Sequence, residues 1–197
     1  MRIAIQIVLV ALILVFSYLL YESIQGPIRF KAEQRIRYNL GIERLKQIRT
    51  AQVFYKAENG KYTGSFDTLI HFIKEGKMKV FRMEIDPNDT IDFSRGIAKD
   101  TILVSIKDSL FRDINVDSLR YIPVTGGNIE MASSEIFTES KVWIPVFEAR
   151  IPNDILLQGL DRQLIINFNY EREQTVKYAG LQVGSIEEAN NNAGNWE

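Results

Sequence analysis

Cysteine is absent from this chain of 197 residues. Its absence excludes disulfide bonds, thiolate catalysis, cysteine zinc sites and the acyl anchor that lipoproteins carry on cysteine. It also slightly favours a location outside the cytoplasm. With 46% apolar and 25% charged residues, the composition is that of an ordinary folded chain. We therefore expect a domain that is stabilised by a packed core.

Histidine and glycine motifs are scarce as well. The only histidine is His71, so a serine triad or a histidine metal site would depend on that one ring. A packed or exposed structural histidine is the interpretation we favour. Neither a phosphate-binding glycine loop nor the dinucleotide-binding glycine pattern occurs, and Gly126 with Gly127 indicates a turn after Val124. The sequence predicts a protein that is not an enzyme, with no catalytic, cofactor-binding or metal-binding residue and no cofactor.

Two groups of aspartates carry the remaining chemical hypothesis. They are Asp86, Asp89 and Asp92 in one loop and Asp108, Asp113 and Asp117 further along the chain. Carboxylates are ligands that calcium accepts, and a pair of carboxylates can serve a hydrolase. However, the glycine and the terminal glutamate of a helix-loop-helix calcium site are absent, and aspartates in turns commonly bond to their own backbone. We expect turns here, with calcium binding and carboxylate catalysis as alternatives.

Residues 3–21 form a long apolar run in which only Gln6 and Ser17 are polar. A helix of this length spans roughly 28 Å, close to the thickness of the hydrocarbon core of a bilayer. A buried core helix rarely lacks every charge over such a length. A cleaved signal would need a shorter apolar core and small residues where this chain has Tyr18 and Tyr21. The run predicts a transmembrane helix that contacts the lipid bilayer through residues 3–21.

The expected anchor ends at Gln25, Gly26 and Pro27, because proline disfavours helix in the residue before it. Anchor and break thus occupy residues 1–27. More basic residues follow the apolar run than precede it, so the positive-inside rule alone would place the domain in the cytoplasm. The signal-anchor character of the start, the absence of cysteine and the resemblance below favour the opposite orientation. We expect a bacterial inner-membrane protein with one membrane span and its main domain in the periplasm.

Residues 28–59 predict a long amphipathic helix. Its apolar face consists of Tyr38, Ile42, Leu45, Ile48, Ala51 and Tyr55, spaced by three or four residues. Its eight basic residues are Arg29, Lys31, Arg35, Arg37, Arg44, Lys46, Arg49 and Lys56, against the acidic Glu33, Glu43 and Glu58. Such a face can attract anionic headgroups, pack against other copies, dock to an acidic partner or simply be solvated. The net charge of -1 and the lack of a recognised binding module argue against nucleic acid.

The end of this helix carries a short pattern formed by Ala51, Tyr55, Gly60 and Tyr62. Glycine favours the left-handed cap that ends a helix, and Ser65 suits the first cap of a short helix over residues 66–75. With the apolar helix, this arrangement resembles the N-terminal half of type IV pilins and type II secretion pseudopilins. The resemblance implies a membrane helix that continues into an amphipathic helix packed on a small antiparallel sheet.

The resemblance covers residues 1–75. No short basic leader ending in glycine precedes the apolar run, and no glutamate lies five residues into that run. In the family these two features serve processing and the registration of filament subunits. The resemblance therefore implies a pilin-like fold used as an anchored component.

Six runs rich in β-branched and aromatic residues predict a mostly antiparallel sheet. They cover residues 78–85, 101–106, 119–124, 142–147, 164–170 and 176–183. Residues 171–175 would connect the last two as a hairpin, and Pro145 indicates a strand edge or a bulge. Residues 185–197 suggest a flexible tail. The predicted fold class is α+β, with one soluble domain over residues 28–184 whose β-rich part covers residues 78–183.

These observations lead to one functional expectation. The chain is expected to be a membrane-anchored structural or interaction subunit of a bacterial cell-envelope assembly, pilin-like or secretion-system-like, which acts by protein–protein binding. Its partners would be other envelope proteins or further copies of itself, with no nucleic acid. The alternatives are a membrane-tethered envelope enzyme that uses the acidic loops and a cytoplasm-facing adaptor that binds lipid.

Overall fold

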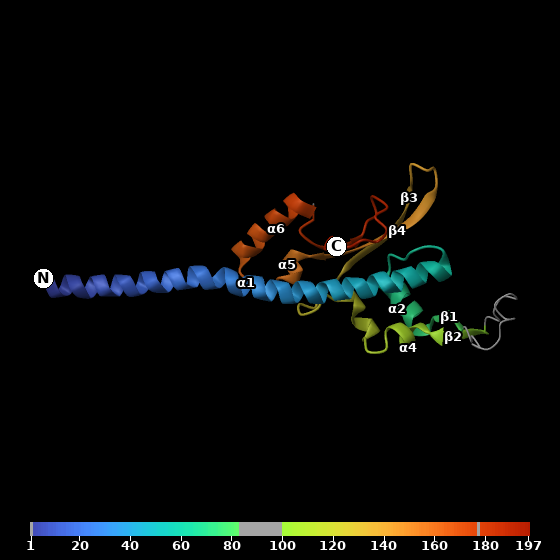
Figure 1. Ribbon diagram of the computed structural model, residues 1–197, viewed down its shortest axis with the longest axis horizontal. Coiled ribbons are helices and arrows are strands. Elements are labelled where there is room, and N and C mark those ends of the chain that lie inside the picture. The colour runs from blue at the N-terminus through green and yellow to red at the C-terminus, as the bar shows by residue number, and fades with distance from the viewer. Residues whose placement is uncertain (1, 83–99, 177) are drawn as a thin grey trace, which may run out of the picture.

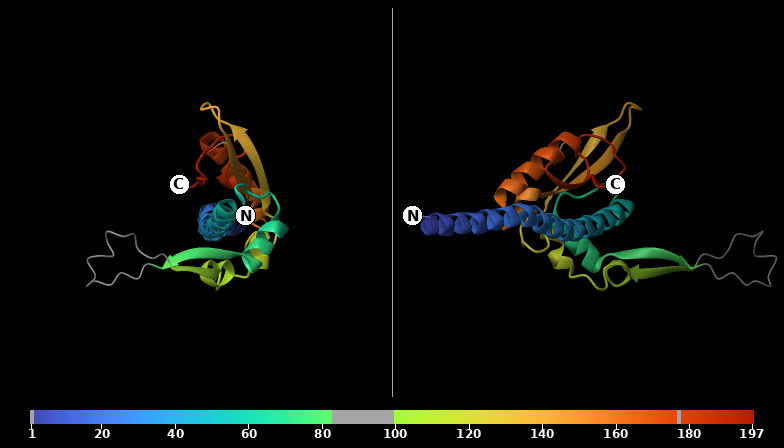
Figure 2. Two further views of the ribbon diagram at one scale, coloured as in Figure 1. Left: turned by 90° about the vertical axis from the view of Figure 1, so that its right-hand side faces the viewer. Right: turned by 60° about the vertical axis from the view of Figure 1, so that its left-hand side comes forward.

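The chain is built around one long helix, α1 (Arg2–Asn59). The computed structural model describes residues 2–82, 100–176 and 178–197. The first part of α1 projects alone, and its second part carries the domain (Figure 1). Seen along α1, the larger sheet and the C-terminal helix lie on one side, and a two-stranded sheet lies on the other (Figure 2). The fold is α+β, as predicted.

Helix α1 does not end at Pro27, which corrects the expected break at residues 25–27. Pro27 lies inside the helix, and the helix continues for 32 further residues to Asn59. A proline in a helix interior removes one backbone hydrogen bond and costs roughly 3 kcal/mol. Here the favourable helix on both sides and the packing that begins at the buried Phe30 oppose this loss. The apolar run and the amphipathic helix are therefore one continuous element.

The apolar face predicted for the second part of α1 is confirmed. Leu45, Ile48 and Ala51 are fully buried, while Tyr38, Ile42 and Tyr55 are partly buried and pack against the same core. Gly41 lies on this face, and a Cβ atom built on it would lie 2.7 Å from Leu181 Cδ1. A glycine at this position thus permits α1 to approach the sheet closely.

The end of α1 and the next helix also follow the prediction. Gly60 has a positive φ of 75°, and its N–H donates to the carbonyl of Lys56 at 2.8 Å. Helix α2 (Phe66–Glu75) covers the residues expected for it. The Ser65 side chain caps it by accepting from the Thr68 N–H. Leu69, Ile70 and Ile73 of α2 are buried against the core.

Two antiparallel sheets follow. The smaller pairs β1 (Lys77–Arg82) with β2 (Asp100–Ser105). The larger has the order β3–β4–β5, from β3 (Glu130–Phe137), β4 (Trp143–Pro152) and β5 (Gly180–Gly184). Four of the predicted runs overlap β1, β2, β4 and β5, although residues 83–85 of the first lie outside the described residues.

Pro145 has no backbone N–H to donate, and it lies where β4 does not pair with β5. It pairs with Glu135 of β3, whereas the pairing of β4 with β5 begins only at Glu148. The central strand is therefore an edge on one side at this point. The expected edge position is confirmed.

Two predicted strands and one predicted hairpin are wrong. Residues 119–124 overlap a 3₁₀ helix, η1 (Val116–Arg120), and residues 164–175 lie in a helix, α6 (Arg162–Val176). Both helices are capped by polar side chains: Asn115 Oδ1 accepts from the Asp117 N–H at 3.1 Å, and Asp161 Oδ1 accepts from the Leu164 N–H at 3.0 Å. Local capping overrode the β-favouring composition. Two short helices, α4 (Ile106–Leu110) and α5 (Asn153–Leu156), complete the elements.

The C-terminal segment, residues 185–197, is packed rather than loose, which corrects the expected flexible tail. Asn195 Oδ1 accepts from the Gln182 N–H of β5 at 3.1 Å. Arg49 of α1 donates to Glu197 Oε1 at 2.7 Å, and this bond lowers the pKa of that carboxyl. Its asparagines and glycine shape turns that hold the segment against the sheet and α1.

One hydrophobic cluster joins α1 to the other helices and to the larger sheet. From the α2 side it includes Ile106, Phe111 and Leu119, and from the sheet it includes Phe147 and Leu181. Because α1 lies between the two groups, its buried face contributes to both. The domain and the packed part of α1 therefore form a single body.

Candidate functional site

The first part of α1 is apolar on all sides and touches nothing. Every described side chain from residue 3 to residue 24 is exposed, from 45% for Leu12 to 73% for Ile3. A water-exposed helix of a globular domain has an apolar stripe, whereas a helix that is apolar all round is buried in a core or in a membrane. By length and composition this helix can cross a bilayer. We call residues 3–24 the bare segment.

The domain is held to α1 through a polar network that begins at Arg37, roughly 20 Å along the helix beyond the bare segment. Arg37 of α1 donates to the carbonyls of Leu156 and Gln158, at 3.2 and 2.8 Å. The neighbouring Tyr38 hydroxyl donates to Asn153 Oδ1 of α5 at 2.5 Å. The Asn153 amide then donates to Asn169 of α6 at 2.8 Å. These bonds fix α5 and α6 on the second part of α1.

Tyr38 gives this network a measurable dependence on pH. Burial raises the pKa of Tyr38 to about 12, against the smaller opposing effects of Arg172 and the bond to Asn153. An unfolded tyrosine loses its proton near pH 10. The folded state thus holds the proton more tightly, and the resulting stabilisation is complete below pH 10 and is lost as the pH rises to about 12.

We therefore expect the free energy of unfolding to fall by about 2 kcal/mol more in the native chain than in Tyr38→Phe between pH 10 and 12. Denaturant titrations at several pH values measure this difference. Burial also raises the pKa of Tyr178 to about 12, so the variant retains part of the decline. Identical pH profiles for the two proteins would contradict the role of Tyr38.

The basic residues of α1 divide into two groups. Those that contact the domain are Arg37, Arg44, Arg49 and Lys56; Arg44 donates to Ser118 Oγ at 2.9 Å, and Lys56 lies 4.8 Å from the Tyr62 ring centre. Those that are exposed are Arg29, Lys31, Arg35 and Lys46. The positive charge of this helix is thus partly structural, and three of the four exposed cations lie next to the bare segment.

A cleft of about 590 Å³ separates α1 from α6 beside these exposed cations. Its walls include Phe30, Tyr38 and Ile42 of α1 and Leu164 and Phe168 of α6. The Phe168 ring meets the other two rings edge to face, with centres 6.5 Å from Phe30 and 5.6 Å from Tyr38. We call this space the α1–α6 cleft. It is a mainly apolar recess whose lining begins at Pro27, close to the bare segment.

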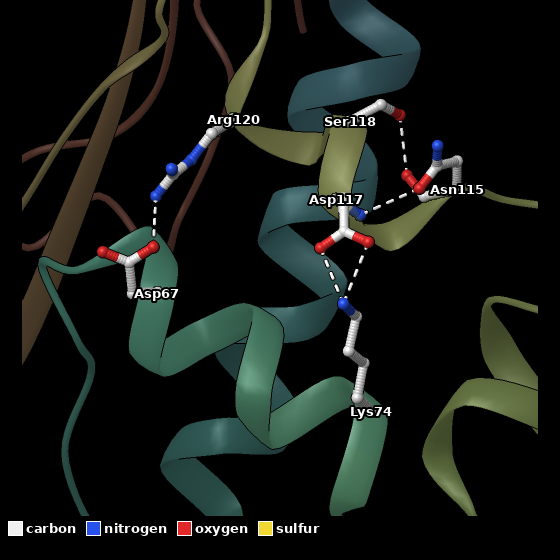
Figure 3. A network of polar contacts seen from close by, with 6 residues as sticks. All are labelled: Asp67, Lys74, Asn115, Asp117, Ser118 and Arg120. Atoms are coloured by element: carbon white, nitrogen blue, oxygen red, sulfur yellow. Dashed lines mark hydrogen bonds and ion pairs between the residues drawn. The ribbon is translucent and has the colours of Figure 1, made fainter.

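The aspartates expected to form acidic sites do not gather in the described part of the chain. Asp86, Asp89 and Asp92 lie outside the described residues. Asp117 accepts from Lys74 at 2.7 and 2.9 Å, next to the pair of Asp67 with Arg120, and Figure 3 shows both pairs joining α2 to η1. Asp113 lines the same pocket as Asp117, together with the cations Lys74, Lys107 and Arg112, whereas Asp108 lies at the start of α4. Within the described residues no group of three His, Asp or Glu side chains is placed to hold a metal.

His71 and Glu148 are the other titratable residues that chemistry could use. The side chain of His71 is 69% exposed and lies 3.5 Å from Glu75, so this histidine is an exposed one, as the favoured interpretation had it. Glu148 is buried, and its carboxylate accepts from Arg150 Nη2 and from Gln182 Nε2, each at 3.0 Å. The buried carboxylate is thus held by two donors in the wall of the sheet.

Aromatic side chains also occupy the far end of the β3–β4 hairpin. Phe137 and Trp143 are 56% and 63% exposed, and their ring centres are 5.2 Å apart. The hairpin extends beyond β5 and away from the bare segment (Figure 1). Large exposed aromatics are frequent in the energetic centres of protein interfaces.

Sequence reasoning missed the α1–α6 cleft and this aromatic pair. The cleft requires α6, whose residues 164–170 suggested a strand although Asp161 supplied a helix cap. The aromatic pair requires β3, whose Ala132, Ser133 and Ser134 gave no apolar run. Comparison of the chain with protein-family models, with curated proteins and with solved structures finds no match.

Proposed function

We propose that this protein is a single-pass membrane protein and a structural or interaction subunit of a bacterial cell-envelope assembly. In this proposal residues 3–21 cross the inner membrane, the domain lies in the periplasm, and the protein acts by binding other envelope proteins or further copies of itself. The resemblance to pilins and pseudopilins suggests the kind of assembly, one related to pili or secretion systems.

The observation that carries this proposal is the exposure of the apolar side chains of the bare segment. The bare segment leaves more than a dozen large apolar side chains in contact with water. Each of these would gain roughly 1.5–3 kcal/mol on burial, so a partner environment is required. A bilayer provides it on all sides at once and matches the roughly 28 Å of residues 3–21.

Two further features support binding rather than catalysis as the activity. The second half of α1 packs against an antiparallel sheet, which is the arrangement that the resemblance implies. The exposed pair Phe137 and Trp143 lies at the end of the domain opposite the bare segment. A domain fixed at the membrane with an apolar contact at its far end is suited to an assembly.

The test is accessibility of the domain to protease in cells, with a tag at the C-terminus. Protease is added to intact cells and to cells with a permeabilised outer membrane. Mass spectrometry verifies that the protein still contains the apolar segment. Digestion that requires only outer-membrane permeabilisation supports the proposal. Protection until the inner membrane is lysed contradicts the periplasmic location and favours the lipid-binding adaptor, for which Arg29, Lys31 and Arg35 would follow the positive-inside rule.

A further inference from the structure

The α1–α6 cleft has both an apolar wall and a charged rim, and the following inference rests on the proposed membrane anchor. We propose that this cleft binds an anionic phospholipid of the membrane that holds the chain. Lys31 and Arg35 contact the phosphate, and one acyl chain lies against Phe30, Leu164 and Phe168. The protein would thereby bind a lipid with its domain as well as with its transmembrane helix.

The apolar and the cationic residues that α1 contributes to the cleft lie on neighbouring rows of this helix. Phe30 and Tyr38 share one row of α1, and Lys31 and Arg35 share the next, because residues four apart lie above one another. Both rows line the cleft, and α6 faces them with Leu164 and Phe168, which are also four residues apart. Apolar and cationic atoms therefore meet along the same space, as an amphiphile requires.

The cations of the rim are available to a ligand. Lys31 and Arg35 are exposed, and no ion pair of the described residues includes them, in contrast to Arg37, which is bonded to Glu33 and to two carbonyls. Glu171 is the charged residue that lines the cleft from α6. Two cations against one carboxylate leave an excess of positive charge, which favours an anionic headgroup over a zwitterionic one.

The position of the cleft fits a lipid that is drawn partly out of the membrane. Pro27 and Phe30, at its near end, lie roughly 9 and 14 Å along the helix beyond residue 21. The headgroup layer extends roughly 5–8 Å beyond the hydrocarbon core, and the lysine and arginine side chains can reach toward it. α6 begins at this same end, close to α1 (Figure 1). A lipid bound here is therefore raised past the headgroup layer, with its phosphate at the cationic rim and one acyl chain transferred from the bilayer to the apolar wall of the cleft.

The test uses full-length protein in nanodiscs of phosphatidylcholine that contain a minority of phosphatidylglycerol. A photo-crosslinking residue replaces Asn167, which lines the cleft, or its neighbour Ile166, which is 50% exposed and does not line it. Mass spectrometry then identifies the adducts. We expect phosphatidylglycerol adducts, enriched over its share of the lipid, from position 167 and few from position 166.

Charge variants complete the test. Lys31→Gln with Arg35→Gln should lower the adduct yield about thirty-fold, since each cation near an anionic surface contributes about 1 kcal/mol. Lys46→Glu, an exposed cation of α1 outside the cleft, should leave the yield unchanged. Equal yields from positions 166 and 167, no preference for phosphatidylglycerol, or adducts to a second protein chain would overturn the lipid site. Failure of the native chain to enter nanodiscs would overturn the anchor itself, so the two failures are distinguishable.

Discussion

Removal of residues 2–24 is expected to release the folded domain from membranes into the soluble fraction. The described side chains among those removed are exposed, and the first buried residue described in α1 is Phe30. The core therefore loses no partner, and the melting temperature of the domain should stay within a few degrees of that of the intact protein in detergent. Ultracentrifugation of lysates measures the distribution, and circular dichroism measures the melting.

Point variants test whether the protein sediments because its helix is inserted in a membrane or for another reason. Arginine costs roughly 2.5–3.5 kcal/mol at the centre of a membrane helix, so Leu9→Arg with Leu14→Arg should also move the protein toward the soluble fraction. Leu40→Arg is the matched control, because Leu40 lies on α1 beyond the bare segment and is 38% exposed. An intact chain that stays soluble without detergent, or a shortened chain that is unfolded, would contradict the division of α1 into two parts.

Truncation of Phe147 should cause the largest loss of stability from a single substitution. Phe147 is fully buried where β4 meets the core, and its ring centre lies 4.9 Å from that of Tyr62. Phe147→Ala removes this ring and leaves a cavity, which costs roughly 3–5 kcal/mol. Thermal unfolding followed by near-ultraviolet circular dichroism should show a melting temperature lowered by ten degrees or more, on the order expected for a domain of this size.

Phe137→Ala provides the control in the adjacent strand. Phe137 is 56% exposed at the hairpin end, so its truncation should change the free energy of unfolding by less than about 1 kcal/mol. If the hairpin end binds a partner, this variant should lose binding while it remains stable. Equal destabilisation by the two substitutions would show that the hairpin end belongs to the core and would weaken its assignment as a contact surface.

The sequence alone predicted the elements whose signals are local. Leu45, Ile48 and Ala51 recur with helical spacing and are buried, and Gly60 ends α1 as a left-handed cap. Ser65 begins α2 at the expected residue. In each case, the residue type and its spacing determine the backbone without help from distant parts of the chain.

The failures occurred where tertiary contacts or caps decide between helix and strand. Residues 164–170 suggest a strand by composition, yet Phe168 packs on Phe30 and Tyr38 only when this segment is the helix α6. Pro27 suggests a helix break, yet helix continues on both sides of it. The α1–α6 cleft depends on both outcomes. The helix cap at Asp161 could have indicated α6, but no local signal shows that α6 packs on α1.

The continuity of α1 has a mechanical consequence. A rod of 58 residues is roughly 87 Å long, and its helix is continuous from the bare segment to the residues packed in the core. A domain on a loose tether would sample many heights and directions above the lipid. Here the tilt and rotation of the helix within a bilayer would determine the orientation of the whole domain relative to the membrane. Copies with adjacent spans would present their aromatic hairpin ends at one common height.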